Sequence, residues 1–148
     1  MHANSLDDLL RSVLEDAVSA LDAQRAAIVL ASDESNDLVL RAVATGDKDS
    51  RGRVYFSKSI ARRCFDKNES VLCRDVNHAP ELAVANSIAD GTMSSVICAL
   101  LRSPRRSLGV LHLDRGPLKD AFTQEDLQLA DALAASVSPA IEVAQLLE

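Results

Sequence analysis

The stretch that most constrains the fold runs from Met93 to Asp114 and contains two apolar segments, Val96–Leu101 and Leu108–Leu113. The polar sequence between them, RSPRRS, contains a proline and two serines, which are typical of a turn. Two aliphatic segments separated by such a break predict an antiparallel hairpin. Because neither segment alternates cleanly between apolar and polar residues, both faces of each strand must be covered. The sequence therefore predicts a hairpin at the centre of a sheet, with a layer on each side.

Amphipathic helices are predicted at both ends of the chain. From Ser5 to about Ala23, apolar residues recur at steps of three and four behind an N-cap serine. Thr123 caps a second helix that runs to the last residue, and Pro139 should bend it. The second helix carries two apolar lines, of which one can pack on the sheet and the other needs a different partner. The chain ends in helix sequence without a cap, so we expect the helix to continue in a longer protein.

The middle of the chain is predicted to supply more strands and two short helices. No strand–helix–strand unit carries the glycine-rich turns of a parallel nucleotide-binding sheet. The element order predicts an α+β fold, an antiparallel sheet with the terminal helices on one face and the short helices on the other. We expect a single domain over 1–148, with its N-terminal helix in 1–23, the sheet in 24–122 and the C-terminal helix in 123–148. The remaining elements are strands at 26–32, 38–45, 54–56 and 70–74, and helices at 58–67 (capped by Ser57 and Asn68) and 81–89.

Composition excludes several classes of partner and compartment. The net charge of -6 argues against binding to nucleic acid or an anionic membrane, since both need a positive surface. The sequence has no signal peptide and no apolar run long enough to span a membrane, which predicts a cytoplasmic protein. Three cysteines without CxxC spacing predict reduced, structural thiols. The arginines gather in three groups that we expect to be solvated loops: Arg51/Arg53, Arg62/Arg63 and Arg102/Arg105/Arg106.

Four segments, covering with their connections about residues 20–148, resemble the signature segments of the GAF domain. The resemblance is greatest to GAF domains found beside forkhead-associated, sigma-54-activator, cyclase or phosphatase modules in bacterial signalling proteins. It implies a six-stranded antiparallel sheet, a small-molecule pocket between the sheet and the middle helices, and terminal helices that pair across a homodimer. One departure is Leu100, where many relatives have proline. The segments are Phe56–Val76, Ser94–Leu101, Ser107–Arg115 and Phe122–Glu142.

The chemistry of better-known GAF subtypes is poorly supported by these residues. The Asn-Lys-Phe-Asp-Glu-type motif of cyclic-nucleotide binders is absent, and no Cys-His pair exists for attaching a bilin. In the GAF-type free methionine sulfoxide reductases, cysteines align near Ile60, Glu69/Ser70 and Val84. This chain instead has cysteines at 64, 73 and 98. We therefore predict no catalytic residue and no metal site, and the sequence names no cofactor.

His112 is the most informative polar residue of the hairpin, since it lies mid-strand on the same face as Val110 and Asp114. A buried imidazole needs a hydrogen-bond partner, and a structural histidine is favoured over a haem, iron or ligand contact. If His112 faces the pocket, the expected lining is Met93, Ser95, Cys98 and His112.

The sequence thus predicts a non-catalytic sensory and regulatory module of a bacterial signal-transduction protein. An unidentified small molecule or partner would bind in the pocket, and the last helix would pass the signal to an effector domain. The alternatives are a thiol enzyme, a cyclic-nucleotide binder, or a degenerate domain that fills its own pocket and only dimerises.

Overall fold

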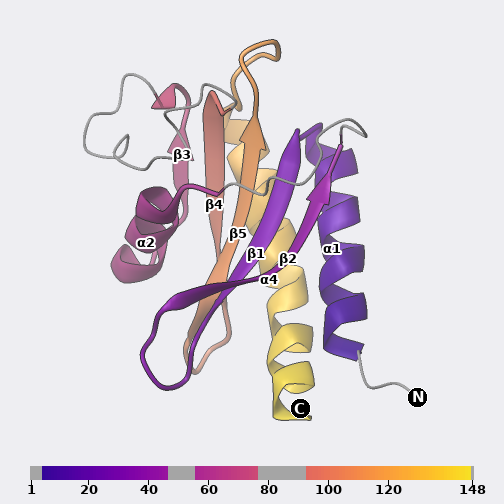
Figure 1. Ribbon diagram of the computed structural model, residues 1–148, viewed down its shortest axis with the longest axis vertical. Coiled ribbons are helices and arrows are strands. Elements are labelled where there is room, and N and C mark those ends of the chain that lie inside the picture. The colour runs from indigo at the N-terminus through magenta and orange to yellow at the C-terminus, as the bar shows by residue number, and fades with distance from the viewer. Residues whose placement is uncertain (1–4, 47–55, 77–92, 148) are drawn as a thin grey trace.

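In the computed structural model, which describes residues 5–46, 56–76 and 93–147, the predicted hairpin forms two inner strands of an antiparallel sheet (Figure 1). The described strands follow the order β2-β1-β5-β4-β3, and every neighbouring pair is antiparallel. The central position of the hairpin is therefore confirmed. The strands are β1 (Arg25–Ala31), β2 (Leu38–Thr45), β3 (Val71–Cys73), β4 (Ser95–Arg102) and β5 (Ser107–Arg115).

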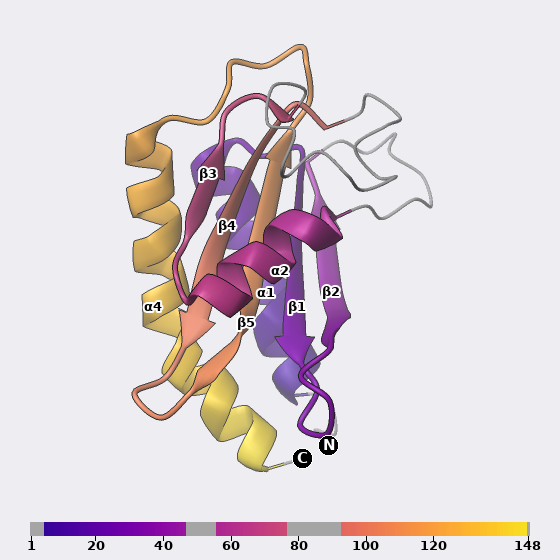
Figure 2. The same ribbon diagram turned by 90° about the vertical axis from the view of Figure 1, so that its left-hand side faces the viewer.

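Helices cover the sheet on both faces, as an α+β fold of this element order predicts. The described helices are α1 (Ser5–Leu21), α2 (Lys58–Lys67) and α4 (Gln124–Leu146). Helix α1 packs on β1 and β2, α4 packs on β4, and the two helices also contact each other. Figure 2 shows α2 lying across the opposite face, where it contacts β3, β4 and β5. The terminal helices thus share one face, as expected.

The alternation of side chains along β4 divides the core into two clusters. Ile97, Ala99 and Leu101 belong to the cluster beneath α1 and α4, whereas Val96, Cys98 and Leu100 belong to the cluster beneath α2. Strand β4 is therefore apolar on both faces because each face meets a different layer. The apolar period predicted for α1 is confirmed by the burial of Leu6, Leu10, Val13, Ala17 and Leu21.

The predicted helix caps are also present. The Thr123 hydroxyl accepts a hydrogen bond from the Asp126 amide at 3.2 Å, and the Asp126 carboxylate accepts one from the Thr123 amide at 2.8 Å. This capping box fixes the start of α4. Ser57 caps α2 by accepting from the Ile60 amide, and Asn68 ends α2 in the left-handed conformation at φ 57°. Helix α4 continues through Pro139.

Leu100 uses the backbone donor that a proline would lack. Its amide donates to the Ser70 hydroxyl at 3.0 Å, and the same hydroxyl donates to the Asp131 carboxylate of α4. The end of β4 is therefore connected through one serine to both β3 and α4.

Some predicted elements fall outside the described residues. The helix at 81–89 and residues 47–55, which include most of the strand at 54–56, are among them. Phe56, the last residue of that strand, is described and lies outside any strand. The described part of the sheet accordingly has five strands, against about six expected.

Gly109 provides a direct test of the packing of β5 on β1. A Cβ atom at this position would lie 2.1 Å from the carbonyl oxygen of Val29, so the two backbones must separate to admit a side chain. Gly109→Ala should lower the free energy of unfolding by about 2 kcal/mol, as overpacking of a core does. Urea unfolding measures the difference in the free energy of unfolding between this variant and the parent chain, and Ser19→Ala on the exposed side of α1 is the control. Equal stability of Gly109→Ala and the parent chain would contradict the close approach.

Candidate functional site

The candidate site is the sheet face beneath α2, to which β5 contributes His112 and Asp114. In the strand register, Cys98 of β4 and Ala27 of β1 flank His112. Val96 and Arg25 flank Asp114 in the same way. Since Val96 and Cys98 belong to the cluster beneath α2, both polar side chains of β5 lie on that face.

His112 is buried, with 1% of its surface exposed, and it has the partner that burial demands. Its Nε2 atom accepts a hydrogen bond from the Ser57 amide at 2.9 Å. The Phe56 ring meets the imidazole edge-on, with 6.0 Å between ring centroids. Because Ser57 is the N-cap of α2, this bond holds the start of α2 against the middle of β5.

The protonation state of His112 follows from its surroundings. Burial, reinforced by the nearby positive charge of Arg25, lowers the pKa of His112 to about 3. The imidazole is therefore neutral near pH 7, which leaves Nε2 free to accept the Ser57 amide. At neutral pH this imidazole therefore acts as an uncharged hydrogen-bond acceptor for the start of α2.

A buried ion pair lies beside His112. The Arg25 guanidinium donates to Asp114 through Nε at 3.1 Å and through its terminal nitrogen at 3.2 Å, and Gln24 also donates to this carboxylate. Asp114 is fully buried and the Arg25 side chain is 8% exposed. Removing two charges from water costs free energy, and the attraction within a buried pair offsets this cost only when its hydrogen bonds have good geometry. Sequence reasoning missed Arg25, although the position of Asp114 on an apolar strand is the signal that a buried cation is needed.

The structure brings three of the four predicted lining residues to the α2 face. Cys98 lies opposite His112 in the register of β4 and β5, and Met93 is buried in the same cluster as Cys98. Ser95 is the exception, because its hydroxyl accepts a hydrogen bond from the Phe122 amide, and Phe122 belongs to the core beneath α1 and α4. Its placement in the pocket lining was wrong: two-residue alternation puts Ser95 on the face of Ile97.

The three cysteines are free and buried, which agrees with their prediction as reduced structural thiols. Burial is the main reason why the pKa of the Cys64 thiol rises to about 12, with smaller contributions from Asp131 and Glu69. Burial likewise raises the pKa of Cys73 and of Cys98. Thiolates are the reactive form of cysteine, so these side chains behave as small apolar groups at neutral pH.

The outer side of α4 carries the second apolar line that the sequence predicts. On the first line Ala130, Ala134 and Ile141 are buried against the sheet. On the second, Leu129, Val143 and Leu147 are 45%, 57% and 79% exposed. Leu133, between them in the sequence, instead packs partly against the core beneath α1 and α4. Exposed large apolar side chains on a helix are typical of an interaction surface.

The described residues form neither a metal-ion site nor a membrane-spanning helix. No group of three His, Cys, Asp or Glu side chains there converges as a metal ion would require. Within the same residues, no helix is long and apolar enough to cross a membrane.

Comparison with known proteins supports the architecture described above, a sheet between paired terminal helices and a short helix. The family model for the GAF domain matches residues 3–142. This chain therefore belongs to the GAF domain family, which confirms the resemblance found in its sequence. No curated protein matches it.

Several solved GAF domains share the fold at low sequence identity. The second GAF domain of DevS from Mycobacterium smegmatis is 17% identical, with a TM-score of 0.71 over 95% of this chain and 96% of that chain. The GAF domain of a two-component sensor histidine kinase from Bacillus halodurans is 21% identical, with a TM-score of 0.73 over 97% and 98%. The GAF domain/HD domain protein from Geobacter sulfurreducens is 12% identical, with a TM-score of 0.74 over 99% and 98%.

The neutral state of His112 predicts how stability depends on pH. An unfolded histidine takes up a proton near pH 6.5, whereas folded His112 does so only near pH 3. Its contribution to stability is therefore complete above pH 6.5 and is lost as the pH falls from 6.5 towards 3. Between pH 7 and pH 5 the loss is about 2 kcal/mol.

His112→Gln isolates this contribution, because the glutamine side-chain oxygen can accept the hydrogen bond from the Ser57 amide and the glutamine side chain does not titrate. Urea unfolding at pH 7 and pH 5 should show that the parent chain loses about 2 kcal/mol more than the variant does. An identical pH dependence for both chains would contradict the buried, neutral state of His112.

Proposed function

We propose that this GAF domain is a non-catalytic sensory and regulatory module that forms a homodimer through its terminal helices. The observation that carries the proposal is the exposed apolar line of α4 formed by Leu129, Val143 and Leu147. A second copy of the chain would cover this line by helix-to-helix packing. The same fold occurs in the GAF domain of a two-component sensor histidine kinase from Bacillus halodurans, which supports the regulatory role.

The sheet offers a physical route for the signal. Strand β4 carries Cys98 on the face beneath α2 and Ile97 on the face beneath α4. A ligand or partner that moves the α2 face would shift the strand on which α4 packs, because close-packed cores transmit displacement. Helix α4 would then pass the shift to an effector domain in the full-length protein, which we propose is bacterial and cytoplasmic.

A non-catalytic role is supported by the state of the thiols and of the imidazole. The raised pKa values of the cysteines disfavour the thiolate that a methionine sulfoxide reductase would use. The lowered pKa of His112 makes it a poor general base or acid near neutral pH.

A second candidate, a domain that dimerises without a ligand, is favoured by the burial of the predicted lining. Cys98, Met93 and His112 are at most 1% exposed, and α2 packs Ile60, Ala61 and Cys64 against the same face. The domain's own side chains thus fill the described part of the face. Mass spectrometry of the purified domain separates the two candidates: a co-purifying small molecule supports the ligand sensor, and a mass equal to the bare chain supports the self-filled domain.

Light scattering at tens of micromolar tests the dimer. We expect a mass of about twice 15.9 kDa for the parent chain. The double variant Val143→Lys, Leu147→Lys should be monomeric with an unchanged circular dichroism spectrum, because both side chains are exposed in the single chain. Leu118→Lys is the matched control, since Leu118 is fully exposed and lies outside α4. A monomeric parent chain, or a double variant that remains dimeric, would refute this interface.

A further inference from the structure

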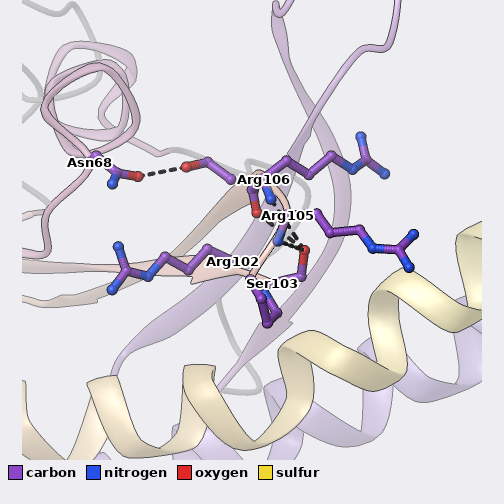
Figure 3. A pocket seen from close by; sticks show the side chains of 7 residues that line it. Asn68, Arg102, Ser103, Arg105 and Arg106 are labelled. Carbon is purple, nitrogen blue, oxygen red and sulfur yellow. Dashed lines mark hydrogen bonds between the residues drawn. The ribbon is translucent and has the colours of Figure 1, made fainter.

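The turn that joins β4 to β5 borders a cleft distinct from the face beneath α2. The cleft has a volume of about 570 Å³, which lies in the range of small-molecule sites. Figure 3 shows three arginine side chains extending from the end of the hairpin in different directions, with Asn68 of the α2 end beside them. The lining residues are Asn68, Arg102, Ser103, Pro104, Arg105, Arg106 and Ser107.

The charge of this cleft opposes that of the whole chain. Three arginines within five residues border it, whereas the chain carries a net charge of -6. Arg106 pairs with Asp33 at 3.2 Å, donates to Gln145 at 3.1 Å and lies 3.8 Å from Glu142. For Arg102 and Arg105, the described part of the chain supplies no acidic partner. Two exposed guanidinium groups are therefore available to a ligand, and guanidinium binds phosphate or carboxylate through paired hydrogen bonds.

The frame of the cleft is held by hydrogen bonds before any ligand arrives. The Ser103 hydroxyl accepts from the amides of Arg105 and Arg106 and donates to Glu142 at 2.8 Å. On the other side, the Ser107 hydroxyl donates to the Asn68 side chain at 2.6 Å. The turn is thereby fixed to both α4 and the end of α2. A preformed frame reduces the ordering cost of binding, which favours a ligand site over a loose solvated loop.

We propose that this cleft binds a small molecule carrying at least two phosphate or carboxylate groups. Arg102 and Arg105 bind the anionic groups, and because their side chains extend to opposite sides of the turn (Figure 3), they suit separated charges better than a single oxyanion. Arg106 is shared between the ligand and its two acidic partners, so the ligand competes with Asp33 and with Glu142 of α4. The site is independent of the sheet face beneath α2 and does not rest on the proposed function.

Isothermal titration at low ionic strength tests the site with inorganic pyrophosphate and citrate as probes. We expect saturable binding of at least one probe; tighter binding of pyrophosphate indicates a phosphate ligand, and tighter binding of citrate a carboxylate ligand. The double variant Arg102→Gln, Arg105→Gln should bind at least about tenfold more weakly, since it loses both guanidinium groups. Arg74→Gln removes a charge at the far end of the sheet, beyond the pairing of Cys73 with Val96, and should bind within about twofold of the parent chain.

Glu142→Gln should strengthen probe binding, in contrast to the arginine double variant. It removes one of the two carboxylates that compete for Arg106, the other being Asp33, while the glutamine oxygen can still accept a hydrogen bond from the Ser103 hydroxyl. We expect this variant to bind the same probe several-fold more tightly. No saturable binding to the parent chain, or equal losses in the double variant and in Arg74→Gln, would overturn the proposal. Unchanged thermal unfolding of the double variant serves as the folding control, because Arg102 and Arg105 are exposed.

Discussion

Burial of β5 on both faces and along both edges is the constraint on which the rest of the structure depends. Between Leu108 and Asp114 every residue of β5 is buried, and β1 and β4 pair with its two edges. Paired edges satisfy the backbone groups, so the two faces remain to be covered by side chains. The long helices α1 and α4 cover one face and α2 covers the other, and this division sets the layer order of the whole domain.

Polar residues on β5 add specificity to this apolar arrangement. His112 is bonded to the start of α2 through Ser57, and Asp114 is bonded to β1 through Arg25. A displaced helix or a slipped register would leave an imidazole or a charge buried without its partner, which is costly. We interpret both interactions as restraints on how α2 and β1 meet the central strand.

The sequence predicted those features that depend on local period and capping. The apolar run Val96–Leu101 predicted that both faces of β4 are covered, and Thr123 and Asn68 marked helix ends correctly. Features that depend on distant partners were missed. Arg25 is the first residue of β1 and has no local sign of burial, since its partner Asp114 lies 89 residues away. Ser95 is a polar residue of the same hairpin as His112, but two-residue alternation puts it on the face of Ile97, where it accepts a hydrogen bond from the Phe122 amide.

Amide hydrogen exchange of the purified domain tests the central role of β5 most directly. Exchange through global unfolding is expected for the most deeply paired strands, and faster local exchange for edge strands. The structure predicts that the slowest amides belong to β5 and to the parts of β1 and β4 that pair with it, while those of the edge strand β2 exchange faster. Amides of β5 that exchange as rapidly as those of β2 would contradict this account.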